Sequence, residues 1–333
     1  MARIVLGIGT SHTPMLAIES RLWMERAKAD YANPALTPSD GRRITYEQLL
    51  QEVGPKYEAV ITPEILQSKA RECAACIERL ADELQAARPD VVVIIGDDQR
   101  ELFDENNQPL LAIYHGDEVV MSSDMGREGL PEWMQQAGKD YLMDQAHRFP
   151  AAPAFAQEVI GSLIERDVDV AAVAGVADPQ KAGVGHAFGF IVRRLFRGRK
   201  IPVLPVLLNT YYPPNVPSAR RAWRIGQQLA RAIEDSPSQA RVAVIASGGL
   251  SHFVVDENLD RGILKAFKDK DADHLCAIPR GALNSGSSEI LNWILAAGAV
   301  GDMPLKWSEY RPLYRTAAGT GTGAGFAVWT SER

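Results

Sequence analysis

The chain has 333 residues, of which 46% are hydrophobic and 23% are charged, and its formal net charge is −6. This composition is typical of a globular protein, and its acidic balance argues against a nucleic-acid-binding surface, which needs clustered lysines and arginines. We therefore expect small molecules or proteins as partners, and no nucleic acid.

The compartment is predicted from the N-terminus and the cysteines. The opening "MARIVLGIGTSH" resembles a strand more than a signal peptide, and no apolar run approaches the roughly 18 residues of a membrane span. The chain has only 3 cysteines, which favours a reducing, cytoplasmic location. Cys73 and Cys76 lie inside a helical pattern, so we expect two small buried helix residues there and no redox pair.

Strands and helices alternate along the chain. The first half predicts a strand over 3–9, a turn-rich insertion with short helices over about 20–61, an amphipathic helix over 61–88, strands over 91–96 and 110–116 (the latter a candidate antiparallel strand), and an irregular segment over 120–150 that is a candidate lid. The second half predicts helices over 154–165, 184–196, 216–234, 257–267, 270–277 and 288–297, and strands over 169–175, 201–209, 241–247 and 323–329. This order indicates a single α/β domain over residues 1–333, with a central, mostly parallel or mixed sheet flanked by helices.

Polar side chains follow several of these strands. They are His12, the group Asp97, Asp98 and Gln99, the group Asn209, Tyr211 and Tyr212, His252, and, after a glycine-rich loop, His186. Ligands bind beyond the carboxyl ends of strands in open α/β sheets, so we expect a metal or acid–base site there. Taken singly, a histidine can be an ordinary loop residue, and the two aspartates can cap the following segment.

Two imidazoles and a carboxylate bind non-haem Fe(II) and leave positions open for substrate and O₂. His12 is the first candidate ligand, and further histidines can move protons near neutral pH. Glu289 is a candidate carboxylate, although a glutamate in the first turn of a helix is equally expected to be stabilised by the helix dipole.

Five short segments in order resemble the class III extradiol catechol dioxygenases, specifically the protocatechuate 4,5-dioxygenase catalytic-subunit family and its 3-O-methylgallate branch. The segments are "GIGTSHTP", "VGHAFGF", "VLLNTYYPP", "SGGLSHF" and "SGSSEILNWILAAGA". The resemblance implies that His12 and Glu289 bind Fe(II), that His252 takes a proton from a bound catechol, and that His186 acts as an acid or orients dioxygen. The resemblance also implies a homodimer. The candidate residues for contacting the substrate are Thr13, Tyr211 and Tyr212.

One position departs from the family pattern. Where the family has "N-D-H" or "P-H", this chain has "D-D-Q", so Gln99 stands at the second iron ligand. Gln99 is then a neutral oxygen ligand, or Asp97, Asp98 or His115 completes the site. An amide oxygen is a weaker donor than imidazole and suits harder cations, which leaves the identity of the metal open.

The function expected from these residues is ring cleavage of a carboxylated catechol, such as a gallate, methylgallate or protocatechuate, with O₂ at an Fe(II) site. The alternatives are a non-catalytic relative that binds a metal or a protein, and a metal-dependent hydrolase that uses a metal-bound water. A hydrolase consumes no oxygen, which separates it from the first hypothesis.

Overall fold

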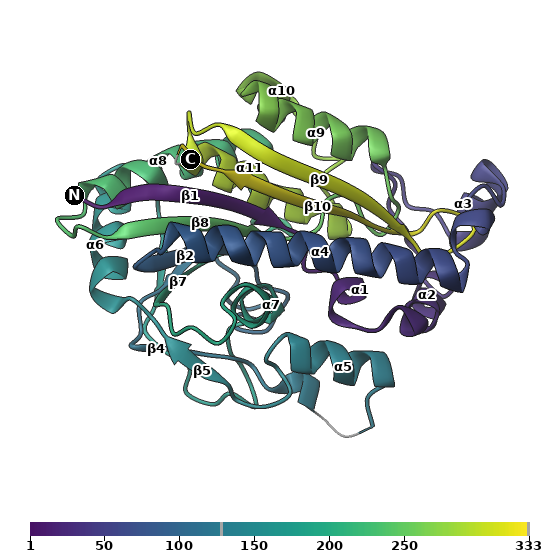
Figure 1. Cartoon of the computed structure of the whole chain (residues 1–333), viewed down its shortest axis with the longest axis horizontal. Coiled ribbons are helices and arrows are strands. Elements are labelled where there is room, and N and C mark those ends of the chain that lie inside the picture. The colour runs from purple at the N-terminus through teal and green to yellow at the C-terminus, as the bar shows by residue number, and fades with distance from the viewer. Residues whose placement is uncertain (127–128, 332–333) are drawn as a thin grey trace.

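The computed structural model describes residues 1–126 and 129–331, and an eight-stranded mixed sheet forms its centre (Figure 1). From one edge to the other the strands are β6 (Ala171–Val173), β3 (Leu111–Tyr114), β7 (Val203–Leu208), β2 (Val91–Asp97), β8 (Arg241–Ser247), β1 (Arg3–Thr10), β10 (Gly321–Trp329) and β9 (Leu305–Tyr314). The four central strands β7, β2, β8 and β1 are parallel. β3 is antiparallel to β7, and β10 is antiparallel to both β1 and β9. The predicted α/β fold is therefore confirmed.

The apolar run of β2 is explained by burial on both faces of the sheet. Val92 and Ile94 belong to the core cluster on one face, whereas Val93 and Ile95 belong to the cluster on the other. Side chains alternate between the faces of a strand, so a strand covered by helices on both sides is apolar throughout.

Helices cover each face. On the first face lie α1 (Pro14–Ala17), α2 (Trp23–Tyr31), α4 (Pro63–Ala87), α5 (Glu132–Asp140) and α7 (His186–Leu195). On the second lie α6 (Pro153–Ile164), α8 (Ala219–Asp235), α9 (Glu257–Asp269), α10 (Ala272–Ala277) and α11 (Ile290–Val300). In Figure 1, α4 crosses in front of the sheet, and α8 and α11 lie behind it. None of the described helices is both long enough and apolar enough to cross a membrane.

The insertion over about 20–61 has a small core of its own. Leu36, Ile44 and Leu49 pack with Ala318, from the turn between β9 and β10. Its helix α3 (Tyr46–Val53) begins with a capping box, in which Thr45 and Gln48 satisfy each other's backbone N–H groups.

Two predictions need correction. The segment 120–150 is not simply irregular, since it contains α5 and most of a small antiparallel sheet, β4 (Glu118–Val120) with β5 (Arg148–Pro150); its residues 127 and 128 lie outside the described part. The edge strand β9 was not predicted, because its charged side chains break the apolar pattern. Helix α4 is confirmed, and Cys73 and Cys76 are buried in it as expected.

Candidate active site

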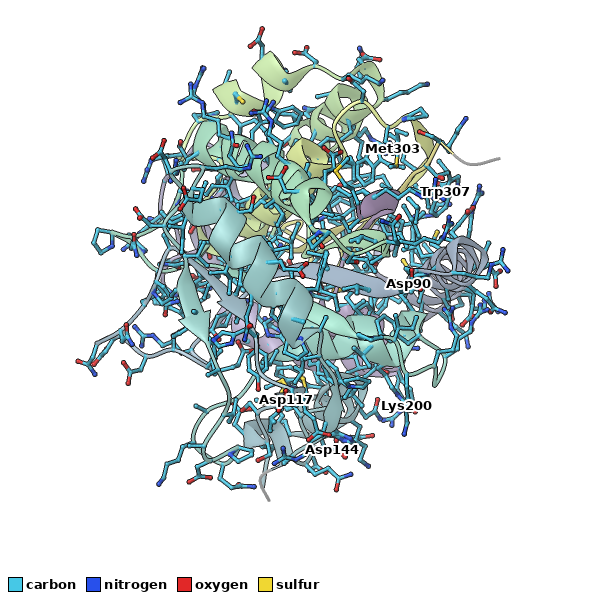
Figure 2. All side chains as sticks on the ribbon, turned by 90° about the vertical axis from the view of Figure 1, so that its left-hand side faces the viewer. Asp90, Asp117, Asp144, Lys200, Met303 and Trp307 are labelled. Atoms are coloured by element: carbon cyan, nitrogen blue, oxygen red, sulfur yellow. The ribbon has the colours of Figure 1, made fainter. Side chains whose placement is uncertain are left out.

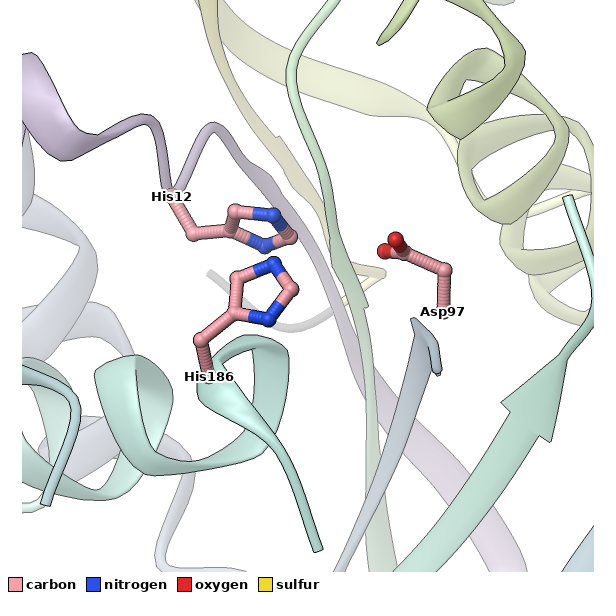
Figure 3. Close-up of side chains that lie close together, drawn as sticks. All are labelled: His12, Asp97 and His186. Atoms are coloured by element: carbon pink, nitrogen blue, oxygen red, sulfur yellow. The ribbon is translucent and has the colours of Figure 1, made fainter. Parts of the chain in front are cut away.

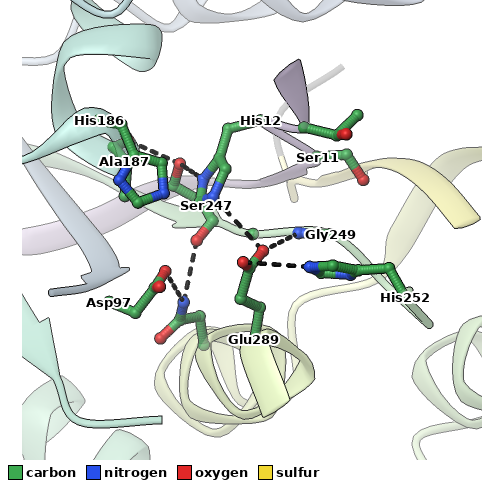
Figure 4. A network of polar contacts seen from close by, with 12 residues as sticks. Ser11, His12, Asp97, His186, Ala187, Ser247, Gly249, His252 and Glu289 are labelled. Carbon is green, nitrogen blue, oxygen red and sulfur yellow. Dashed lines mark hydrogen bonds and ion pairs between the residues drawn. The ribbon is translucent and has the colours of Figure 1, made fainter. Parts of the chain in front are cut away.

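The carboxyl ends of three adjacent parallel strands carry the central side chains of the site. β1 leads to His12, β2 ends at Asp97, and β8 ends at Ser247 and leads to His252. Because β2, β8 and β1 are neighbours that run in the same direction, these residues meet at one edge of the sheet. Figure 4 shows them around the carboxylate of Glu289.

His12 is held in one tautomer. Its Nδ1 lies 2.9 Å from Oγ of Ser247, and that hydroxyl donates its proton to the carbonyl of Ala187 at 2.6 Å. Ser247 must therefore accept a hydrogen bond from Nδ1–H, which leaves the lone pair on Nε2. This buried Nε2 has no hydrogen-bond partner among the described residues, and it lies 3.4 Å from Oε2 of Glu289. Two such acceptors repel each other unless a proton or a cation lies between them.

Glu289 is the last residue of a 3₁₀ turn, Ser285–Glu289, directly before α11. Its buried carboxylate points into the site. Oε2 accepts a hydrogen bond from the backbone of Gly249 at 2.6 Å, and Oε1 lies 3.2 Å from Nε2 of His252. Burial alone would raise its pKa, but the neighbouring charge of His252 helps to hold the pKa of Glu289 well below its usual range.

His252 is also fixed by its neighbours. Nδ1 lies 2.8 Å from the carbonyl oxygen of Leu250, which can only accept, so Nδ1 carries a proton and Nε2 is the atom that exchanges one. A Cβ at Gly286 would lie 2.0 Å from Cδ2 of the ring, so the ring packs directly on glycine backbone. Burial lowers the pKa of His252, but Glu289 outweighs it and the pKa is raised.

Gln99 lies in the site, with its amide nitrogen toward the carboxylates. Nε2 is 3.0 Å from Oδ2 of Asp97 and 3.4 Å from Oε1 of Glu289. In this orientation the amide donates hydrogen bonds to both acids, so binding a metal through oxygen would require it to turn over. Burial and the charge of Glu289 raise the pKa of Asp97. The predicted ligand role of Gln99 stays a prediction.

His186 starts α7 and is oriented by Glu101. The Glu101 carboxylate accepts hydrogen bonds from Nδ1 of His186, from its backbone N–H at 3.3 Å, and from the backbone N–H of Gln99 at 2.6 Å. Burial lowers the pKa of His186, but Glu101 more than offsets this and raises it to about 10. The His186 and His12 rings are edge-on, with centroids 4.6 Å apart.

These side chains form a set that suits a metal ion. His12, Asp97 and His186 each offer a ligand atom within 4.8 Å of the other two (Figure 3), and Glu289 adjoins His12. Imidazole nitrogen and carboxylate oxygen are ligands of Fe(II), Zn²⁺ and Mn²⁺. The unpartnered Nε2 of His12 opposite a carboxylate is the position at which a cation would relieve repulsion.

A family model described as the catalytic LigB subunit of aromatic ring-opening dioxygenase matches residues 54–327. The chain belongs to this family. The LigB match includes Asp97, His186, His252 and Glu289, whereas His12 precedes it.

The chain is also similar to a gallate dioxygenase of Pseudomonas putida, with 40% identity over 57 residues. That alignment covers 17% of this chain and 16% of the relative. The similarity is therefore local and does not establish which branch of the LigB family the chain belongs to.

Two of the alternatives for the remaining metal ligand, Asp98 and His115, differ from Asp97 in their bonding or their position. The Asp98 carboxylate accepts backbone N–H groups of Leu102 at 2.8 Å and of Arg100 at 3.2 Å, which is the capping role considered above. His115 follows β3, which runs opposite to β7, so it lies at the other edge of the sheet. Figure 2 labels Asp117, two residues after His115, and Asp90, directly before β2, in a view of the left-hand side of Figure 1. The suggestion that His115 could reach the metal is therefore wrong.

The candidate substrate residues lie around the same edge. The Thr13 hydroxyl is 3.1 Å from that of Thr322, and both are buried. Tyr211 packs against Tyr212, with ring centroids 5.3 Å apart. The Asn209 side chain instead bonds the backbone of its own loop.

Three residues that support the site were not predicted from the sequence. Ser247 and Glu101 fix His12 and His186, and the Tyr141 hydroxyl donates to the carbonyl of His12 at 2.7 Å. The sequence could have indicated Glu101 as a site residue, because it is the acidic residue at the end of "GDDQRE". Nothing in the sequence indicated Tyr141, since it lies in a segment predicted to be irregular.

Proposed function

We propose that this chain is an extradiol ring-cleaving dioxygenase that acts on a carboxylated catechol-type substrate at a non-haem Fe(II) site. The observation that carries the proposal is the pair of buried acceptors, Nε2 of His12 and Oε2 of Glu289, facing each other at 3.4 Å beside Asp97. Family membership supports ring opening as the reaction class.

We propose His12, Glu289 and Asp97 as the residues that hold the metal. Two carboxylates and an imidazole, all buried at one sheet edge, resemble the mixed nitrogen and oxygen sets that bind Fe(II) with open positions. Gln99 then has a supporting role, in which its amide donates to Asp97 and Glu289 and fixes both. Such outer partners orient metal ligands and tune them. Gln99 as an oxygen ligand is the alternative.

Fe(II) held by His12, Glu289 and Asp97 would supply Lewis-acid and redox chemistry for the diol and O₂. His252 takes the phenolic proton on Nε2, because its Nδ1 is committed to the carbonyl of Leu250. His186 is held as an imidazolium by Glu101, so it brings positive charge and an Nε2–H donor. His186 as a further metal ligand, beside His12 and Asp97, is the alternative to this role.

The substrate class is supported by the local similarity to a gallate dioxygenase. We propose that a gallate-, methylgallate- or protocatechuate-like ring binds near Thr13 and Tyr211, with Tyr212 packed behind Tyr211. The homodimer and the cytoplasmic location stay predictions, and light scattering tests the first.

Metal analysis of anaerobically purified protein, paired with oxygen uptake on catechol, protocatechuate, gallate and 3-O-methylgallate, tests the proposal. We expect one iron per chain and uptake that depends on the diol. Protein that binds iron but consumes no oxygen with any diol would favour the hydrolase or the non-catalytic relative. Protein that binds no added Fe(II) would contradict the metal site itself.

A further inference from the structure

A pocket of about 510 Å³ lies beside the site, and Tyr211 and Ser285 form part of its wall. Ser285 directly precedes Gly286, on which the ring of His252 packs. The charges of Glu289 and Asp97 also act on the phenol of Tyr211, whose pKa is raised mainly by burial. The pocket therefore adjoins the proposed catalytic centre.

The opposite wall is built by the insertion. Leu36 and Ile44 exchange two backbone hydrogen bonds of 2.9 Å, which close a hairpin. At its tip Gly41 has a φ of +83°, and a Cβ there would lie 3.0 Å from Cα of Gly281. This close backbone approach seats the hairpin on the loop after α10 and brings Arg43 and Arg280 to one pocket.

The pocket has positive charge without a counter-ion. Arg42, next along the hairpin, pairs with Asp40 and Glu52 at 2.7 and 2.9 Å. In the described part of the chain, by contrast, Arg43 and Arg280 make no ion pair, and no acidic residue lines this pocket.

A buried polar group lies in the same wall. Thr210 is 2% exposed, yet its hydroxyl has no hydrogen-bond partner among the described residues. Guanidinium groups bind carboxylates through charge-assisted hydrogen bonds. A buried hydroxyl without a partner is stabilised when a polar ligand forms a hydrogen bond with it.

We propose that this pocket binds an anionic arm of the substrate, so that the enzyme prefers a catechol whose carboxylate stands away from the ring and meets Arg43 and Arg280. The inference rests on the proposed function, and within carboxylated catechols it favours substrates with the carboxylate on a side arm over gallate-like substrates with the carboxylate on the ring. A carboxylate attached directly to the ring would leave most of the pocket empty, since pockets of about 300–1,000 Å³ suit drug-sized ligands.

Two diols with arms of equal length test the role of the charge. Dihydrocaffeate ends in a carboxylate and 4-propylcatechol in a methyl group. In oxygen-uptake assays we expect Arg43→Gln and Arg280→Gln each to raise KM for dihydrocaffeate about tenfold, with kcat and the constants for 4-propylcatechol unchanged. Arg42→Gln, at the neighbouring ion-paired residue, is the matched control and should change neither. Equal KM values for both diols in the wild type, or equal shifts for both diols in the variants, would overturn the proposal.

A binding measurement separates this inference from the function. Hydrocinnamate has the same arm but no diol, so it cannot be cleaved, and calorimetry gives its Kd in metal-free protein. We expect the two pocket variants, but not Arg42→Gln, to weaken binding about tenfold. If no diol is consumed and binding still depends on these arginines, the proposed function fails and the pocket assignment stands. Equal binding to wild type and variants would refute the pocket assignment even in an active enzyme.

Discussion

Nε2 of His12 and Oε2 of Glu289 lie 3.4 Å apart, with both side chains at most 4% exposed. Ser247 holds His12 in the tautomer that puts a lone pair on Nε2. Two unshielded acceptors in the protein interior destabilise the folded state. A cation bound between them would turn this repulsion into attraction to both atoms. The site is therefore expected to be more stable with a metal than without it.

Replacing His12 should remove the metal. We expect His12→Ala to weaken Fe(II) binding by more than about a hundredfold, since losing an outer partner alone typically costs about 10–100-fold. Iron content and Fe(II) titration of the purified variant measure this. His186→Gln should keep its iron, because we assign His186 to proton donation, and His115→Ala at the far edge is the neutral control. Iron loss in His186→Gln equal to that in His12→Ala would make His186 a ligand.

Asp97 and Gln99 should differ in their effect on the metal. Asp97→Asn should lower Fe(II) affinity by more than about a hundredfold, whereas Gln99→Ala should lower it by only about tenfold, as expected for a residue that orients ligands. Fe(II) titration of both variants compares them directly. A larger loss in Gln99→Ala than in Asp97→Asn would identify the glutamine as the ligand.

His252 should separate catalysis from metal binding. Its Nδ1 is committed to the carbonyl of Leu250, so Nε2 is the ring atom that exchanges a proton, and His252→Ala should lower kcat by at least about a hundredfold, the usual contribution of general acid–base catalysis. Iron content should remain that of the wild type. Normal turnover in this variant would remove the base from the proposed mechanism.

Much of this site was predictable because its residues follow strands. His12, Asp97 and His252 stand after apolar runs that read as buried strands, and parallel strands place such residues together. The roles of Gln99 and Asp98 were not predictable. They depend on which donors meet each side chain, and the amides that bond Asp98 come from the turn that follows it.

The insertion was recognised as a polar, turn-rich segment, but its attachment was not. Asp30 and Arg315 form a buried ion pair across nearly the whole chain length, with oxygens of Asp30 2.6 and 2.8 Å from the guanidinium. No local pattern connects residues so far apart.

The edge strand β9 was missed for a related reason, because one of its faces carries charged side chains that only tertiary packing accommodates.

The ion pair between Asp30 and Arg315 should contribute strongly to the free energy of unfolding. Asp30→Asn leaves Arg315, which is 1% exposed, without its carboxylate, and breaking a buried pair by removing one partner costs about 3–5 kcal/mol. Urea unfolding of the variant measures this loss. Asp40→Asn removes an exposed pair to Arg42 and should cost no more than about 1 kcal/mol. Equal losses in both variants would show that the Asp30 pair is not the main attachment of the insertion.

Asp260 should make stability depend on pH. It is fully buried, and it accepts hydrogen bonds from the Tyr310 hydroxyl at 2.7 Å and from the backbone of Ser251 at 2.8 Å. Burial raises its pKa from 3.8 to about 6, so between these values the folded state holds the proton more tightly than the unfolded state. The free energy of unfolding that this group contributes should therefore fall as pH rises, by about 2 kcal/mol between pH 4 and pH 6, out of about 3 kcal/mol over the whole titration at 1.36 kcal/mol per unit.

The comparison with Asp260→Asn isolates this contribution, because the amide does not titrate. The difference in unfolding free energy between wild type and variant should shrink by that amount from pH 4 to pH 6 and stay constant above about pH 7. A difference that is flat across this range would mean that the Asp260 carboxyl is ionised in the folded protein throughout, with its hydrogen bonds outweighing burial.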